Sequence, residues 1–247
     1  MSEARSGEWL AQWEYAHRGL HGDALHGAGA PENSLGAAEA AIACGLAIEC
    51  DVQMSRDGVP MVFHDWCLDR LTPTTGPLAD YTERELVTMR LAATDQTIPS
   101  LARFLALVGA RVPLLVEVKS KPDHLPEQGL EAVVSAISAY LGPLALMSFD
   151  PRICGWLRRH VPQIVRGLVG TDSYRNGFEG MWRNKTTLDE ALPDFLAVDY
   201  RDLAKPEGAR WRAGGKPLLT WTVRSPEQRL AARELADALI VEGHGLA

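Results

Sequence analysis

Two short segments near the N-terminus carry residue types that suit metal-assisted phosphoryl chemistry. The first reads AHRG over residues 16–19 and is followed by PENS over residues 31–34. The second reads IECDV over residues 48–52, RDG over 56–58 and VFHD over 62–65. Carboxylates bind hard cations, histidines transfer protons near neutral pH, and arginine binds phosphate. These segments therefore indicate a site for a phosphate ester and a divalent ion.

Four charged residues have the spacing of a metal site built on strands. Glu49 and Asp51 are two residues apart, as are Glu117 and Lys119, and because side chains alternate along a strand each pair shares one face. The spacing alone supports two alternatives. In one, Glu49, Asp51 and Glu117 bind a cation that offsets the cost of burying them, and oxygen ligands favour Mg²⁺ or Ca²⁺ over Zn²⁺. In the other, Lys119 and Glu117 form a buried ion pair and the remaining acids face solvent.

The candidate proton-transfer and substrate-binding residues each follow an apolar segment. His17 and His64 end two such segments, and although a histidine there is commonly structural, two beside a carboxylate pair favour general acid and base roles. Arg18 suits either a pair of phosphate oxygens or a surface ion pair, and Lys119 would add a second positive charge. Trp221 either walls the pocket or belongs to the core.

Other residues near these motifs are predicted to shape the backbone around the site. Asn33 is predicted to cap the helix that follows it, with a direct role in catalysis as the alternative. Asp57 with Gly58 is predicted to form a tight turn between two strands. Asp65 either orients the ring of His64 or forms part of a turn. The loop 20–30 is interpreted as a lid or a specificity element.

Short apolar segments alternate with amphipathic ones along the whole chain, which predicts parallel βαβ units. The expected strands span residues 13–17, 46–52, 60–64, 114–119, 144–149, 164–169, 195–199, 217–223 and 238–242. The expected helices span residues 34–44, 100–109, 128–140, 151–160, 187–192, 204–214 and 226–235. With 60–64 as an inserted strand, eight strands remain, which predicts a single α/β domain over residues 1–247, a (β/α)8 TIM barrel with no final helix. A doubly wound open sheet is the alternative.

Composition narrows the class of partner. The chain has 247 residues and a formal net charge of −7, whereas a dedicated nucleic-acid-binding protein usually has a basic surface. No apolar stretch is long enough to cross a membrane, and the N-terminus has no apolar run typical of a signal peptide. We expect a cytoplasmic enzyme with a small-molecule substrate, whose oligomeric state the sequence leaves open.

The ordered motifs resemble those of the glycerophosphodiester phosphodiesterase family, whose pattern continues in EVK at 117–119, SFD at 148–150 and WTV at 221–223. The resemblance implies the barrel and a metal-dependent hydrolysis that yields sn-glycerol 3-phosphate and an alcohol. It implies that His17 and His64 are the general acid and base. Residues 241–244 (VEGH) depart from the Thr-Asp pair of many relatives. The alternatives are a related phosphodiesterase acting on lysophospholipids or other diesters, and a catalytically silent barrel that binds phosphate esters.

Overall fold

The computed structural model describes residues 7–22, 29–125 and 127–246. These residues divide into two compact units, each described by itself. The first unit contains the chain up to His17, the segment that begins at Ser120 and everything from Leu144 on. The second unit contains Arg18 to Lys119 and the segment from Glu127 to Pro143. The prediction of a single domain over residues 1–247 stays a prediction.

The elements alternate in the expected order. The strands are β1 (Tyr15–Ala16), β2 (Ala47–Met54), β3 (Pro60–Val62), β4 (Leu114–Val118), β5 (Leu144–Ser148), β6 (Val165–Gly170), β7 (Phe195–Asp199), β8 (Leu218–Val223) and β9 (Ala238–Val241). The α-helices are α1 (Leu35–Ala43), α2 (Glu83–Leu86), α3 (Leu101–Val108), α4 (Glu127–Ile137), α5 (Pro151–His160), α6 (Lys185–Ala191), α7 (Pro206–Ala213) and α8 (Pro226–Leu235). The short 3₁₀ helices are η1 (Gly7–Gln12), η2 (Leu78–Asp80), η3 (Met181–Arg183), η4 (Tyr200–Asp202) and η5 (Gly243–Leu246).

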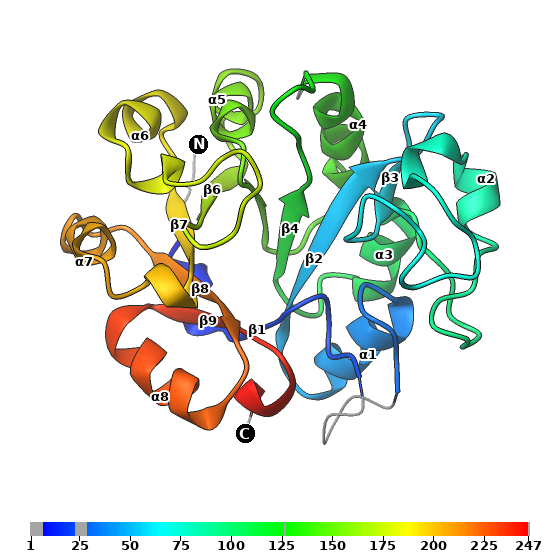
Figure 1. The fold of residues 1–247 in the computed structure, drawn as a ribbon, viewed down its shortest axis with the longest axis horizontal. Helices are drawn as coiled ribbons and strands as arrows, with labels where there is room; N and C mark the ends of the chain where they lie inside the picture. The colour runs from blue at the N-terminus through cyan, green and yellow to red at the C-terminus, as the bar shows by residue number, and fades with distance from the viewer. Residues whose placement is uncertain (1–6, 23–28, 126, 247) are drawn as a thin grey trace. The chain divides into compact units, whose positions relative to one another are not determined.

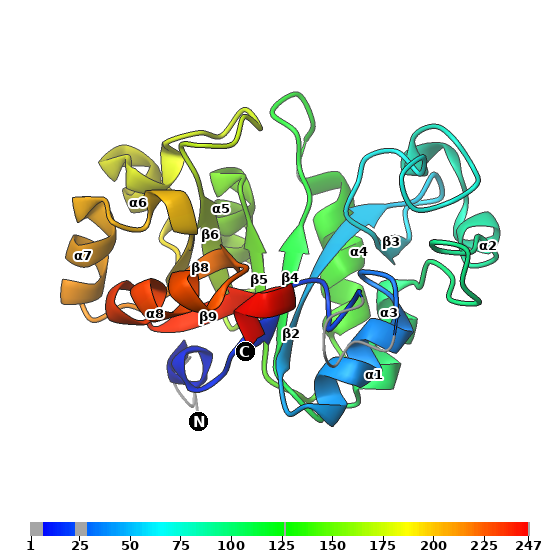
Figure 2. The same ribbon diagram turned by 60° about the horizontal axis from the view of Figure 1, so that its bottom comes forward.

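The first unit is a parallel sheet covered by helices. Its strands pair in the order β1-β9-β8-β7-β6-β5, each pair parallel. Helices α5 to α8 lie along one side of these strands (Figures 1 and 2). Apolar side chains from the strands and helices form the core between them, among them Leu196, Leu218 and Leu239. Each βα unit thus buries its helix against the sheet, as in an α/β barrel.

The second unit contains the inserted strand. Strand β2 pairs in parallel with β4 and in antiparallel with β3. The β2–β3 connection is the predicted tight turn: Gly58 has a φ of +75°, which glycine adopts at little cost. Beyond β3, a second apolar core that includes Met61, Phe63, Leu68 and Leu71 holds the segment that follows.

Every expected strand and helix is present, with ends that differ by a few residues. Helix α2 was not expected, because its four residues are too few to show a helical repeat of apolar residues. A capping box between Thr82 and Glu85 starts it. Over the described residues, β9 is followed by η5 and no α-helix, as predicted. None of the helices in the described ranges is long and apolar enough to cross a bilayer. Residues 23–28 of the predicted lid lie outside the described residues.

Candidate active site

The three predicted metal ligands lie together inside the second unit. Glu49 and Asp51 come from β2 and Glu117 from β4, where Asp51 and Glu117 occupy paired positions of the two strands. Their exposed fractions are 2%, 2% and 8%. One carboxylate oxygen of each lies within 4.8 Å of those of the others. The alternative in which Glu49 and Asp51 face solvent is therefore wrong.

Two cationic side chains neutralise part of this negative charge. The Lys119 ammonium lies 3.1 Å from Glu117 Oε1 and 3.6 Å from Asp51 Oδ1. The Arg18 Nε lies 3.4 Å from Asp51 Oδ2, and the Arg18 backbone amide donates to Glu49 Oε2 at 3.0 Å. Both predicted phosphate-binding residues of this unit therefore border the acidic group.

Burial and neighbouring charges shift the pKa values of Glu49 and Asp51 in opposite directions. Burial, reinforced by the charges of Asp51 and Glu117, raises the pKa of Glu49 well above its ordinary value. Burial alone would also raise the pKa of Asp51, but Lys119, His64 and Arg18 outweigh it and hold that pKa below its ordinary value. Glu49 therefore holds its proton to a higher pH than Asp51 does.

The backbone around Arg18 explains the His-Arg-Gly sequence. Gly19 has a φ of +77°, and a Cβ there would lie 2.9 Å from the Ala37 backbone on α1. Only glycine lets the chain pass so close to the helix. The Gly19 amide then donates to the Glu49 carbonyl at 3.2 Å, which places Arg18 beside β2.

The PENS segment supports the acidic group, and here one prediction is wrong. The helix cap is Ser34, whose Oγ accepts from the Ala37 amide at 3.0 Å. Asn33 instead donates from Nδ2 to Asp51 Oδ2 at 2.9 Å and accepts from the Asp51 amide at 3.2 Å. It has a φ of +58°, a conformation that asparagine tolerates better than most residues. Asn33 and Ser34 are both residue types that commonly cap helices. Ser34 takes that role here because Asn33 is hydrogen-bonded to the buried Asp51.

His64 follows β3 in the second unit, and two neighbours hold it. Its Nδ1 lies 2.7 Å from Asp65 Oδ1, so the predicted alternative in which Asp65 orients the ring describes the contact. An ionised carboxylate only accepts, so Nδ1 carries the proton and Nε2 is available for chemistry. Gln53 Nε2 donates to the carbonyls of Phe63 and Asp65 at 3.0 and 2.7 Å, which fixes the backbone on both sides of His64.

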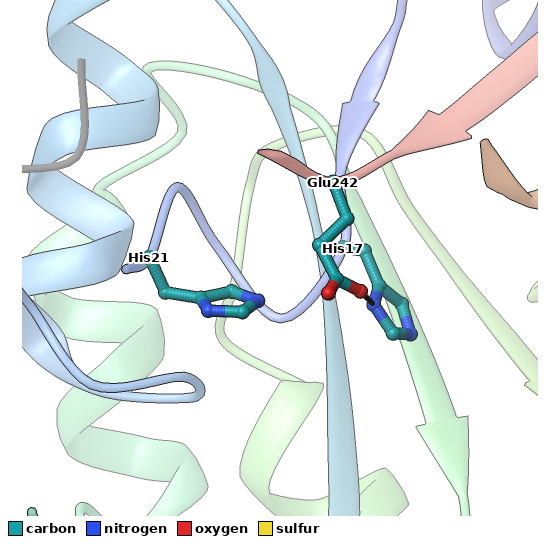
Figure 3. A group of neighbouring side chains, drawn as sticks. All are labelled: His17, His21 and Glu242. Carbon is teal, nitrogen blue, oxygen red and sulfur yellow. Dashed lines mark hydrogen bonds and ion pairs between the residues drawn. The ribbon is translucent and has the colours of Figure 1, made fainter. Parts of the chain in front are cut away.

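His17 follows β1 in the first unit and has an equivalent partner. Its Nδ1 lies 2.7 Å from Glu242 Oε2, at the end of β9, as Figure 3 shows. Arg224 also donates to Glu242 Oε2, at 3.0 Å. Although burial opposes it, the bond to His17 and the charges of His17 and Arg224 lower the pKa of Glu242 to about 2. Each histidine therefore has a carboxylate on Nδ1.

Trp221 lies on β8 of the first unit. Its Nε1 donates to the Ala197 carbonyl at 3.0 Å, and its ring meets that of Phe149 edge to face, with centroids 5.5 Å apart. The side chain is partly exposed. The structure thus brings Glu49, Asp51, Glu117, Lys119, Arg18 and His64 into one unit, and places His17 and Trp221 in the other. That all eight line one pocket stays a prediction.

Sequence reasoning missed two supporting residues. Gln53 shares the strand face of Glu49 and Asp51, because it follows Asp51 by two residues, and that spacing could have identified it. Glu242 lies 225 residues from His17. Its signals were an acidic residue directly after the last strand and its place in the VEGH segment, where many relatives have a Thr-Asp pair.

The acidic group fits a hard divalent cation. Its donors are three buried carboxylates, the ligand type that Mg²⁺ and Ca²⁺ prefer. Two cationic side chains face three acids, so a negative charge is left over when all three ionise. A bound cation would balance that charge, to which the raising effect of Asp51 and Glu117 on the pKa of Glu49 also points.

A family model and individual relatives of similar sequence all indicate one enzyme family. A model of the glycerophosphoryl diester phosphodiesterase family matches residues 17–243. A glycerophosphodiester phosphodiesterase of Caldanaerobacter subterraneus is 30% identical over 224 residues, covering 86% of this chain and 88% of the relative. Glycerophosphodiester phosphodiesterase 1 of Bos taurus is 24% identical over 246 residues, covering 87% of this chain and 72% of the relative.

Among solved structures, one similar protein is an Oleispira antarctica phosphodiesterase in complex with the product sn-glycerol-3-phosphate. It matches with a TM-score of 0.80 at 23% identity, covering 94% of this chain and 93% of that chain. This likeness shows the fold and confirms the predicted (β/α)8 barrel over the open-sheet alternative.

Proposed function

Because the chain belongs to the glycerophosphoryl diester phosphodiesterase family of enzymes, we propose that it hydrolyses glycerophosphodiesters to sn-glycerol 3-phosphate and an alcohol. The observation that carries the proposal is the buried group of Glu49, Asp51 and Glu117, bordered by Lys119 and Arg18. A phosphodiester is anionic and gains charge as it is attacked, so it needs positive charge around it. Lys119 and Arg18 would supply part of that charge, and a cation bound by the three carboxylates would supply the rest.

Glu49, Asp51 and Glu117 are the proposed ligands of a Mg²⁺ or Ca²⁺ ion. When bound, such an ion neutralises charge on the phosphoryl group and lowers the pKa of a hydroxyl group beside it. Asn33 holds Asp51 by two hydrogen bonds, and the Arg18 amide holds Glu49. The ligands are thus oriented before a cation arrives, which reduces the ordering cost of binding.

The two histidines are proposed to move the protons. One takes a proton from the attacking group, which is water or the 2-hydroxyl of the glycerol unit, and the other donates a proton to the leaving alkoxide. Attack by the 2-hydroxyl would form a cyclic phosphate, which water then opens to give glycerol 3-phosphate. Each histidine has Nδ1 against a carboxylate, Glu242 for His17 and Asp65 for His64. Their Nε2 atoms are therefore the ones that face the reaction.

Arg18 and Lys119 are proposed to bind the phosphoryl oxygens, and Trp221 to contact the alcohol. Arg18 presents a planar fork that matches two oxygens, whereas Lys119 presents a compact charge. Because both are paired with acids in the free protein, their net attraction for phosphate grows once a cation occupies those acids. Arg18→Lys keeps the charge but loses the fork, so we expect it to lower turnover and not only affinity.

The test is a turnover assay with a panel of diesters. Glycerophosphocholine, glycerophosphoethanolamine, glycerophosphoglycerol and lysophospholipids are supplied separately, with released glycerol 3-phosphate as the readout for the first three and released alcohol for all. We expect chelation to abolish turnover and Mg²⁺ or Ca²⁺ to restore it. His17→Ala and His64→Ala should each lose about 10²- to 10⁴-fold in rate, with an unchanged circular dichroism spectrum. Full turnover with excess chelator, or no product from any diester with any divalent ion, would refute the proposal.

A further inference from the structure

The geometry points to Arg70 as a positioning residue that orients His64 and Arg18 together. This inference rests on the proposed function and adds to it a residue outside the predicted site. Arg70 lies in the segment after β3, five residues beyond Asp65. Its guanidinium group binds two carboxylates, Asp65 and Glu32, and each of these holds one of the two proposed reacting side chains.

The first link leads to His64. Arg70 Nε donates to Asp65 Oδ2 at 2.6 Å and Nη2 donates to Oδ1 at 3.1 Å. Asp65 Oδ1 also lies 2.7 Å from His64 Nδ1. A carboxylate held on both oxygens by a planar guanidinium has a fixed plane, so the imidazole ring bonded to it has a fixed direction as well.

The second link leads to Arg18. Arg70 Nη1 and Nη2 donate to the two oxygens of Glu32 at 2.9 and 2.7 Å. Arg18 Nη1 donates to Glu32 Oε1 at 2.8 Å. The Glu32 side chain is 10% exposed, and this buried carboxylate is shared by two cations. Contacts in the second unit therefore form a continuous chain from His64 through Asp65, Arg70 and Glu32 to Arg18.

The position of Arg70 in its segment suits this role. Leu68 is fully buried in the core beyond β3, and Leu71 packs against the same core, so the backbone on both sides of Arg70 is anchored. The Arg70 side chain itself is 48% exposed. Glu32 keeps Arg18 as a second partner, and Arg70→Lys retains the positive charge, so this variant should fold and change mainly the geometry of the site.

The primary test compares Arg70→Lys with a matched control in the same unit. Arg111 also binds a carboxylate through both Nη atoms, which donate to the two oxygens of Glu39 at 3.0 and 2.8 Å. Its side chain is 44% exposed. We expect Arg70→Lys to lower kcat about 10- to 100-fold, as for other residues that orient catalytic groups, because lysine cannot span both carboxylates. Arg111→Lys should keep wild-type kcat. Equal kcat for the two variants would overturn the positioning role.

A double-mutant cycle tests the route through Asp65. If Arg70 acts on His64 through Asp65, then Arg70→Lys should have a much smaller effect in an Asp65→Asn background than in the wild type. Full additivity of the two losses in kcat would contradict that route. The cycle also separates orientation from charge, because lysine retains the charge.

A spectroscopic measurement keeps this inference independent of turnover. The His64 signals in the ¹⁵N NMR spectrum of the imidazole groups are identified as those that are present in the wild type and absent from the His64→Gln variant. We expect Arg70→Lys to shift the His64 Nδ1 signal and Arg111→Lys to leave it in place. If wild-type protein cleaves no diester, the proposed function fails and this spectrum decides the inference, since an unshifted His64 signal in Arg70→Lys would overturn it.

Discussion

At the scale of residues, each proposed reacting group is held by a second side chain. His17 is bonded to Glu242, His64 to Asp65, and Asp51 to Asn33. Such pairing fixes the ring nitrogen or oxygen that faces the reaction, and thereby reduces the reorganisation that the reaction requires.

The first prediction concerns Glu49. Because burial and the charges of Asp51 and Glu117 raise its pKa well above the ordinary value, protons compete with a cation for the Glu49 carboxylate. The affinity for Mg²⁺ or Ca²⁺ should therefore rise with pH, by up to about tenfold per pH unit for one displaced proton. Calorimetric titration in two buffers of different ionisation enthalpy measures the released protons. Glu49→Gln should remove the release, and a wild-type protein that releases none would contradict the assignment.

The second prediction concerns Glu242. Its folded-state pKa is lowered from 4.5 to about 2, so its contribution to stability is present above the unfolded pKa and is lost as the pH falls from about 4.5 through about 2. The free energy of unfolding of wild type should thus exceed that of Glu242→Gln at pH 6, and the difference should shrink towards pH 2. Urea unfolding at a series of pH values measures it. Glu234→Gln, at an exposed position of α8, controls for the loss of one surface charge, and a difference independent of pH would argue against the His17 pair.

At the scale of elements, the start of α1 combines a helix cap with support for the acidic group. Adjacent residues divide the two tasks: Ser34 caps the helix and Asn33 binds Asp51. Strand β2 likewise presents Glu49, Asp51 and Gln53 on one face, so one strand carries two proposed metal ligands and the residue that fixes the backbone of His64.

Variants at the start of α1 should separate these tasks. Ser34→Ala should lower the free energy of unfolding by about 1 kcal/mol, the usual contribution of such a cap, and leave turnover unchanged. Asn33→Ala should lower turnover as well, because Asp51 loses two hydrogen bonds. Urea unfolding and steady-state kinetics are measured on both variants. Loss of turnover in Ser34→Ala with none in Asn33→Ala would show that the two roles are reversed.

At the scale of the whole molecule, an acidic chain concentrates uncompensated negative charge in one buried place. The formal net charge is −7, and many described acids outside this group form ion pairs with arginine or lysine, as Glu39 does with Arg111 at the surface. The buried group has more acids than cations. A cation bound to that group should therefore raise the free energy of unfolding of the protein.

Thermal unfolding measures this effect. A ligand that binds only the folded state stabilises it by about 2.7 kcal/mol when its concentration is 100 times the dissociation constant. We expect Mg²⁺ or Ca²⁺ to raise the Tm of wild type and to raise that of Glu117→Gln much less. An equal rise in both proteins would place the ion elsewhere. Equal concentrations of a monovalent salt control for general screening.

The order and type of the elements, and the three members of the acidic group, could be predicted from the amino-acid sequence. Alternating apolar segments predict βαβ units because each strand and helix must bury its apolar side. The two-residue spacing of Glu49 and Asp51 predicts a shared face because strand side chains alternate. These are local properties, and the structure bears them out.

The hydrogen-bond partners of these residues could not be predicted, because they depend on how distant parts of the chain fold together. The sequence could not choose between Asn33 and Ser34 as the cap, because both suit the local rule, and the choice depends on a carboxylate 18 residues away. It could not pair His17 with Glu242, which lies 225 residues along the chain, or join Arg70 to Glu32, 38 residues away. A hydrogen bond forms between groups within about 3 Å, and the fold sets such distances between residues far apart in the chain.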